Sequence, residues 1–198
     1  MSEEKIRRIC VFCGSNPGRR PEYADAARAM GRVLVERGLG LVYGGGKVGL
    51  MGIVADTVLA GGGQVVGVIP EALMAREVGH AGLTELRVVA TMHERKAAMA
   101  DLADGFVALP GGFGTFEEFC EVLTWSQLGF HPKPCGLLNV AGYYDPLLAL
   151  FDHAVEEGFV PPPHRALVME ETDPARLLDR FAGFRPPSTG KWITRDER

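Results

Sequence analysis

A glycine-rich turn followed by acidic side chains is the part of this sequence best suited to chemistry. Residues 110–114 contain three glycines, and Thr115, Glu117 and Glu118 follow them directly. Such a turn, placed between a strand and the N-terminus of a helix, exposes backbone N–H groups beside the positive end of the helix dipole, which favours phosphate. The spacing fits neither the dinucleotide pattern G-x-G-x-x-G nor the Walker pattern, which needs a lysine after its last glycine. We therefore predict a phosphate site of another kind, against the alternative that the glycines only make a tight turn.

A buried strand and an amphipathic helix are expected to hold this turn. Residues 106–109 form a short apolar run that predicts a strand buried on both faces. Thr115 is a suitable N-cap, and Glu118 follows at the spacing of a capping box. Apolar residues recur at helical spacing after it, namely Phe116, Phe119, Cys120, Leu123 and Leu128.

The rest of the chain repeats the alternation of a short apolar strand and an amphipathic helix. It predicts an α/β fold, a doubly wound, Rossmann-like, three-layer α/β/α arrangement with a mainly parallel sheet. Ligands bind such folds beyond the carboxyl ends of the strands, where the glycine loops 14–18, 44–49 and 111–114 would converge. The expected strands are residues 6–13, 39–43, 65–69, 86–89, 106–109, 135–139 and 166–169, and the expected helices 21–37, 50–60, 91–103, 115–128, 145–157 and 173–181, with 71–86 as a lid or loop with a weak helix.

Composition narrows the function classes. A length of 198 residues suits one domain over 1–185, with 186–198 as a tail. The net charge of −4 argues against nucleic-acid binding, and the absence of a long apolar span or a signal peptide predicts a cytoplasmic protein without membrane contact. Cys10 and Cys13 have a C-x-x-C spacing but lie in a predicted strand, where they would point to opposite faces as buried thiols.

Two motifs identify a family resemblance. At MHERKAAM (92–99) and PGGFGTFEE (110–118) the sequence closely resembles the LONELY GUY family of cytokinin riboside 5′-monophosphate phosphoribohydrolases, long mislabelled lysine decarboxylases. The segments 12–18, 43–52, 68–80 and 124–148 also look like family segments, so the resemblance covers roughly residues 6–182. Phe113 stands where the family commonly has tyrosine.

The resemblance implies hydrolysis of the N-glycosidic bond of a purine nucleoside 5′-monophosphate, AMP or its N6-prenyl form, to free base and ribose 5-phosphate. It assigns catalysis to Arg95 and Glu118 and implies a homodimer, for which helix 115–128 offers apolar surface. The implied substrate-binding residues are Lys96, Gly112, Gly114, Thr115 and Glu117 around the phosphoribose, Thr124 nearby, and Glu71 or Glu77 toward the base, together with the motif and loop residues Met92, Gly111, Phe113, Gly14, Ser15, Gly44 and Gly45.

Each assigned role has a simpler alternative. A carboxylate at position 118 would stabilise the positive charge that develops on the ribose and orient water, but the same glutamate could cap its helix. Arg95 could hold phosphate or ribose hydroxyls, pair with Glu118, or lie in solvent, and Lys96 would point about 100° away from it. His93 is a weaker candidate for a proton donor.

Two other functions fit the same fold, and a third chemistry is disfavoured. An AMP-preferring nucleosidase of purine salvage would use the same chemistry, and a non-catalytic binding protein like the molybdenum-cofactor carriers would need neither Arg95 nor Glu118. No histidine or carboxylate spacing typical of a metal site occurs, so no metal and no cofactor are predicted. Lys47 would be the Schiff-base lysine of a pyridoxal-phosphate decarboxylase, but the sequence shows no acid to partner that cofactor.

Overall fold

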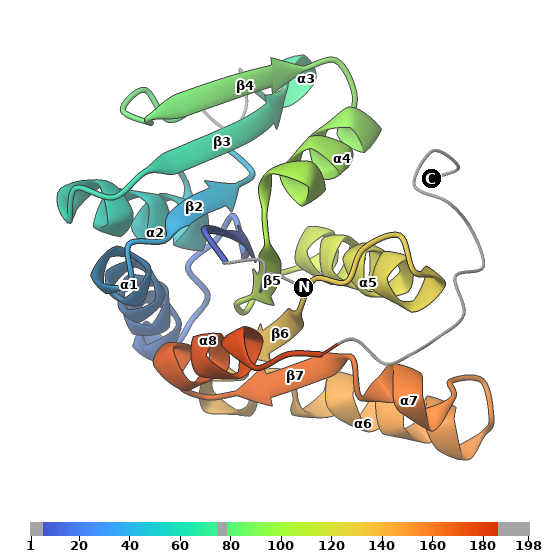
Figure 1. The fold of residues 1–198 in the computed structure, drawn as a ribbon. Coiled ribbons are helices and arrows are strands. Elements are labelled where there is room, and N and C mark those ends of the chain that lie inside the picture. Colours follow the sequence, from blue (N-terminus) through green and yellow to red (C-terminus); the bar gives the residue numbers. More distant parts are fainter. Residues whose placement is uncertain (1–5, 75–78, 186–198) are drawn as a thin grey trace.

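The computed structural model describes residues 6–74 and 79–185 and contains one seven-stranded sheet, all of whose strands are parallel (Figure 1). The strand order is β4-β3-β2-β1-β5-β6-β7. The predicted parallel, doubly wound α/β fold is confirmed. The strands are β1 (Arg8–Phe12), β2 (Gly40–Tyr43), β3 (Val65–Pro70), β4 (Glu85–Val89), β5 (Gly105–Ala108), β6 (Cys135–Leu138) and β7 (Val168–Glu171).

Helices cover both faces of the sheet and make the three layers (Figure 1). One apolar cluster joins the sheet to α1, α2 and α8, and a second joins it to α4, α5 and α6. The helices are α1 (Pro21–Glu36), α2 (Gly49–Ala60), α3 (Glu71–Met74), α4 (Met92–Leu102), α5 (Phe113–Leu128), α6 (Asp145–Glu156), α7 (Pro162–Arg165) and α8 (Pro174–Ala182), with the 3₁₀ turn η1 at Val140–Gly142. None of these helices is long and apolar enough to cross a membrane.

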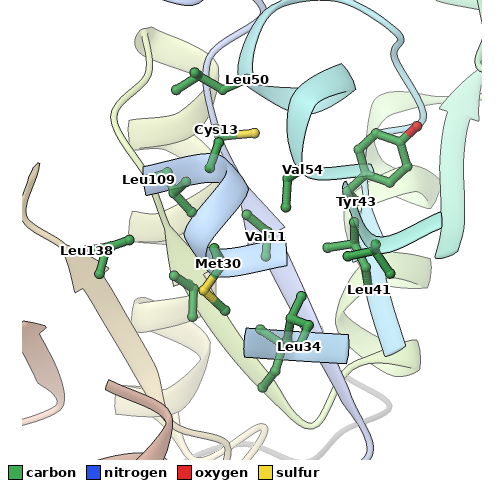
Figure 2. Close-up of a cluster of buried hydrophobic side chains, with 14 of the residues drawn as sticks. Val11, Cys13, Met30, Leu34, Leu41, Tyr43, Leu50, Val54, Leu109 and Leu138 are labelled. Carbon is green, nitrogen blue, oxygen red and sulfur yellow. The ribbon is translucent and has the colours of Figure 1, made fainter. Parts of the chain in front are cut away.

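The central strand β1 sends alternate side chains into the two apolar clusters, as the two-residue period of a strand requires. Val11 and Cys13 pack with Leu109 and the helices of the first cluster (Figure 2), whereas Cys10 belongs to the second. All four cysteines are free thiols, and Cys10 and Cys13 are buried. The prediction that these two residues face opposite sides of the sheet is confirmed.

The chain changes direction across the sheet between β1 and β5. From β1 it builds outward through β2 and β3 to β4, and then returns to place β5 on the other side of β1. The carboxyl ends of β1 and β5 are therefore neighbours, and their loops diverge, which is the place where ligands bind in doubly wound sheets.

The glycine loops meet at this place. The N–H of Gly14 donates to the carbonyl of Pro110 at 3.1 Å, and the N–H of Leu50, at the start of α2, donates to the carbonyl of Gly14 at 2.9 Å. Gly49 lies so close to Ser15 that an added Cβ would stand 2.3 Å from the Ser15 carbonyl carbon. The predicted convergence of segments distant in sequence is confirmed.

Three local predictions were wrong or incomplete. The helix α5 begins at Phe113 with Gly112 as its N-cap, so Thr115 lies inside the first turn and the predicted capping box with Glu118 does not exist. The short elements η1 and α7 were not predicted, because a single 3₁₀ turn and a four-residue helix with two prolines leave no periodic pattern. The weak helix expected within segment 71–86 is present as α3, and the strand expected at 86–89 begins one residue earlier, as β4. The predicted tail, 186–198, lies outside the described residues.

Candidate active site

The turn between β5 and α5 presents free backbone donors at the carboxyl edge of the sheet. Its carbonyl groups are taken by the protein, since Pro110 accepts from Gly14 and Gly112 accepts from Phe116 at 3.1 Å. Within the described part of the chain, no acceptor is found for the N–H groups from Gly112 to Thr115. These groups belong to the first turn of α5, where the helix dipole is positive, so the turn can bind an anion such as phosphate.

Close packing fixes the shape of this turn. Thr115 is buried, and an added Cβ on Gly111 would stand 2.1 Å from its Oγ1 and 2.8 Å from the nitrogen of Gly14. Gly112 and Gly114, by contrast, have open space where a side chain would be. The first glycine is therefore required by packing, whereas the other two leave room for a ligand to approach the backbone.

Arg95 is a buried arginine at the same edge of the sheet. It lies on α4 with 6% of its surface exposed. Its Nη2 donates to the carbonyl of Gly44, at the end of β2, over 3.4 Å, and its Nη1 lies 3.8 Å from Sδ of Met92. The buried Nε has no hydrogen-bond partner among the residues described. Buried donors are rarely left unpaired, so Arg95 retains a donor that a ligand can use.

Glu118 on α5 completes a buried charge pair with Arg95. The Arg95 Nη2 and Glu118 Oε1 atoms are 3.7 Å apart, and the two side chains are 8% and 11% exposed. Burial raises the pKa of the Cys10 thiol well above its usual range, and the negative charge of Glu118 raises it further. Glu118 is the sixth residue of α5, so its backbone lies about one helical turn beyond the N–H groups of the glycine turn. The predicted pair of Arg95 and Glu118 is thus brought together across 22 intervening residues.

Gly44 makes room for the guanidinium group. A Cβ added to Gly44 would stand 1.9 Å from Nη2 of Arg95 and 3.0 Å from its Cζ. The next residue, Gly45, has a φ of 79°, a conformation that residues with side chains rarely adopt. Gly44 is therefore required by the close approach of Arg95, and Gly45 is required by the conformation of the backbone turn.

Lys96, although adjacent to Arg95, takes part in a different contact. Its Nζ pairs with Glu117 and, at 2.8 Å, with Glu121, both on α5. Burial alone would lower the pKa of Lys96, but the hydrogen bonds to these carboxylates outweigh it and raise that pKa. Lys96 and Glu117 therefore link α4 to α5. The family resemblance places both residues around the phosphoribose, whereas the contacts found for Lys96 in the described chain are with α5.

A cleft of about 270 Å³ opens between the first glycine loop and the turn of β5. Its lining includes Gly14, Ser15, Leu50, Gly111 and Gly112. Two tyrosines also line the cleft, Tyr23 from α1 and Tyr143 from the segment after β6, with ring centroids 5.7 Å apart. Sequence reasoning missed both tyrosines, because no motif or spacing links residues so distant along the chain.

The remaining predicted site residues are exposed, hydrogen-bonded within their own helix, or outside the described part of the chain. Glu71 is exposed at the start of α3, Phe113 is 91% exposed, and Glu77 lies outside the described residues. Thr124 is nine residues beyond Thr115, which is about 14 Å along a helix, and its hydroxyl donates to the carbonyl of Cys120 at 2.7 Å. Within one chain, Thr124 is therefore not brought to the phosphate-binding turn.

The neighbouring histidines and Lys47 have structural or exposed positions. His80 is buried, its Nε2 lies 2.7 Å from Oδ1 of Asp56, and its backbone N–H donates to the carbonyl of Gly45 at 3.2 Å. It thus ties the segment before β4 to the second glycine loop. His93 is exposed on α4, and Lys47 is exposed between β2 and α2. Across residues 6–74 and 79–185, no group of three or more His, Cys, Asp or Glu side chains is arranged to hold a metal ion.

Comparison with known sequences finds close relatives. A family model described as "Possible lysine decarboxylase" matches residues 51–181. The "Probable cytokinin riboside 5'-monophosphate phosphoribohydrolase LOGL1" of Oryza sativa subsp. japonica is 58% identical over 180 residues, which cover 91% of this chain and 81% of that protein. The "Cytokinin riboside 5'-monophosphate phosphoribohydrolase LOG3" of Arabidopsis thaliana is 51% identical over 94% of this chain and 86% of its own length.

Comparison with solved structures supports the fold. The molybdenum cofactor carrier protein of Chlamydomonas reinhardtii superimposes with a TM-score of 0.69 over 91% of this chain and all of that chain, at 20% sequence identity. The molybdenum cofactor binding protein of Rippkaea orientalis gives a TM-score of 0.66 at 19% identity, over 91% of this chain and 98% of that one. At this level of identity the likeness concerns the arrangement of strands and helices alone.

Proposed function

Because this chain belongs to the LONELY GUY family of cytokinin riboside 5′-monophosphate phosphoribohydrolases, we propose that it hydrolyses the N-glycosidic bond of purine riboside 5′-monophosphates, with N6-prenylated adenine nucleotides as its preferred substrates. The products are the free base and ribose 5-phosphate. The observation that carries the proposal is the buried pair of Arg95 and Glu118, in which Glu118 lies about one turn along α5 from N–H donors that have no acceptor in the described chain. A phosphate site next to a carboxylate is what cleavage at the anomeric carbon of a nucleotide requires.

In the proposed reaction Glu118 acts at the anomeric carbon. As the bond from C1′ to the base nitrogen breaks, its electron pair leaves with the base and positive charge develops on the ribose. The carboxylate stabilises this charge and accepts a proton from the water whose oxygen bonds to C1′. The base nitrogen takes up one proton from solvent as it leaves, and Glu118 returns the proton that it accepted to solvent, so the atoms and charges of water, nucleotide and products balance.

Arg95 orients the carboxylate and binds the ribose phosphate in this proposal. The 3.7 Å between Nη2 and Oε1 is longer than a hydrogen bond, so the pairing guides Glu118 without a tight contact. Because the guanidinium is a planar fork, its remaining donors suit the oxygens of ribose or phosphate. Glu71 or Glu77 is proposed to contact the base. Glu71 follows β3 at this edge of the sheet.

The phosphate supplies much of the recognition. Removal of the 5′-phosphate leaves the N–H donors of the turn without their anion. Each buried or aligned donor that loses a charged partner costs about 1–3 kcal/mol of binding free energy. Nucleosides without phosphate are therefore expected to be poor substrates. Gly112, Gly114 and Thr115 are the proposed phosphate contacts, joined by Gly14 and Ser15 from the facing loop.

We also propose a homodimer, supported by apolar side chains that one chain leaves uncovered. Phe113 is 91% exposed at the start of α5, and Phe116, Leu123 and Trp125 on the same helix are only partly buried. Phe119 does not contribute, because it is buried in the core of its own chain. Sedimentation equilibrium tests this, with a mass of about 43 kDa expected from the 21.4 kDa chain.

The test of the proposed activity is the release of free base by the purified protein. AMP and isopentenyladenosine monophosphate are supplied separately, and adenosine and isopentenyladenosine serve as controls. We expect release from the monophosphates alone, faster with the prenylated nucleotide. A higher rate with AMP would instead assign the protein to purine salvage. Binding of AMP without any release of base would exclude the hydrolase and favour a carrier.

A further inference from the structure

Tyr143 holds the one carbonyl of the phosphate-binding turn that the backbone leaves unpaired. Its hydroxyl donates to the carbonyl oxygen of Gly111. The carbonyls on either side are taken by Gly14 and Phe116. The turn is therefore fixed from three separate elements, and the bond from Tyr143 is the only one of the three supplied by a side chain.

The geometry of the peptide bond links this contact to the ligand. No cis peptide occurs in the described chain, so the C=O of Gly111 and the N–H of Gly112 point in opposite directions. Gly112 has no Cβ to restrict its backbone, and a Cβ built there would meet no atom within 4 Å, so packing at Gly112 does not fix the direction of this peptide. A donor on the Gly111 carbonyl thus sets the direction of the Gly112 N–H, the first donor of the anion-binding turn.

The tyrosine itself is well held. Its ring contacts the rings of Tyr23, Phe116 and Tyr144, with centroids 5.7, 6.3 and 5.1 Å away. Burial raises the pKa of Tyr143, and the neighbouring Tyr23 raises it further, while the bond to Gly111 lowers it by less. The hydroxyl therefore keeps its proton at neutral pH and remains a donor.

We propose that Tyr143 is a positioning residue for substrate phosphate: its hydroxyl holds the Gly111 carbonyl so that the N–H of Gly112 faces the 5′-phosphate of the nucleotide. The inference rests on the proposed function and deepens it, because it assigns phosphate recognition to a tyrosine that does not itself donate to the phosphate. Loss of the hydroxyl should weaken ground-state binding of every ligand that carries the 5′-phosphate and leave the chemical step intact.

Tyr144 provides a matched control. It is the next residue, its hydroxyl donates to the carbonyl of Leu109 at 2.7 Å, and that oxygen lies before the turn rather than in it. The variants are Tyr143→Phe and Tyr144→Phe, which both keep the aromatic ring. KM and kcat with AMP, the inhibition constant of ribose 5-phosphate, the dissociation constant of AMP and the melting temperature are measured for each.

Tyr143→Phe should raise KM, the dissociation constant of AMP and the inhibition constant of ribose 5-phosphate together, by roughly 3- to 10-fold, which is the effect of one hydrogen bond. Its kcat should stay within about twofold of the wild type. Tyr144→Phe should lower the melting temperature and leave these constants unchanged.

Unchanged binding constants in Tyr143→Phe, or equal changes in both variants, would overturn the inference. If the wild-type protein released no base, the proposed function would fail, yet the dissociation constants of AMP and ribose 5-phosphate would still decide the role of Tyr143.

Discussion

Replacement of Gly44 by alanine tests how strictly the guanidinium of Arg95 must be placed. The new Cβ would stand 1.9 Å from Nη2, and ordinary contact begins at 3.4 Å, so the guanidinium must move by about 1.5 Å. A shift of that size breaks its bond to the Gly44 carbonyl, now 3.4 Å long, and changes its contact with Glu118. Gly44 does not have a positive φ, so alanine can adopt its backbone conformation.

A displacement of about 1 Å at a catalytic group can cost about 100-fold in rate, or roughly 2.7 kcal/mol of transition-state stabilisation. We therefore expect Gly44→Ala to lower kcat/KM for the nucleotide by about two orders of magnitude. Because the clash is with the far end of a flexible side chain, the melting temperature should change little. Base release and thermal unfolding measure the two effects.

Two further variants isolate the cause. Gly183→Ala, at the end of α8, meets only an ordinary 3.8 Å contact with the Arg180 carbonyl and should retain full activity. In an Arg95→Ala background, Gly44→Ala should cost less than about twofold, because the group that it displaces is absent. Wild-type kcat/KM in folded Gly44→Ala, or a full second loss in the Arg95→Ala background, would refute this reasoning.

Three other changes bear on stability and are followed by thermal or denaturant unfolding. The Tyr43 hydroxyl is buried without a partner among the described residues (Figure 2 shows the ring), so Tyr43→Phe should be neutral or stabilise the fold by up to about 1 kcal/mol, and a loss above that would indicate a missed partner. The pKa of Lys96 is raised by Glu117 and Glu121, so the wild type should be more stable than Lys96→Met at neutral pH. This difference in the free energy of unfolding should decline as pH rises past about 10.4, and a difference independent of pH would contradict the reasoning. Ala141 has a φ of 52°, so Ala141→Gly should not destabilise, and a clear decrease in melting temperature would show that its methyl group packs more strongly than the strain costs.

Most of the fold could be predicted because its strands are buried on both faces. Strands such as β3 and β5 are buried at every position and therefore appear as continuous apolar runs between glycines and helices. The N-cap of α5 was misplaced by three residues, because the side chain of Thr115 is typical of an N-cap whereas the helix is capped at Gly112. The left-handed conformation of Ala141 in η1 has no sequence signal, because alanine rarely adopts it.

The candidate site could be predicted where its residues share a motif and not where they meet only in space. Arg95 and Glu118 lie in two motifs on consecutive helices, and the parallel sheet brings those helices to one edge. For Lys96 the sequence predicted only that its side chain points about 100° away from that of Arg95, because adjacent helix residues are about 100° apart. It did not identify the partners of Lys96. Tyr143 approaches the turn from 32 residues beyond Gly111, so its contact required the structure.

Our central claim is that the Glu118 carboxylate drives cleavage of the glycosidic bond. The most direct measurement compares wild type and Glu118→Gln on isopentenyladenosine monophosphate, with base release and nucleotide binding followed on the same samples. The amide keeps the shape of the side chain and removes its charge, so we predict equimolar base and ribose 5-phosphate from the wild type, and from the variant near-normal binding with a kcat lower by at least about 100-fold. Undiminished turnover by Glu118→Gln would contradict the claim.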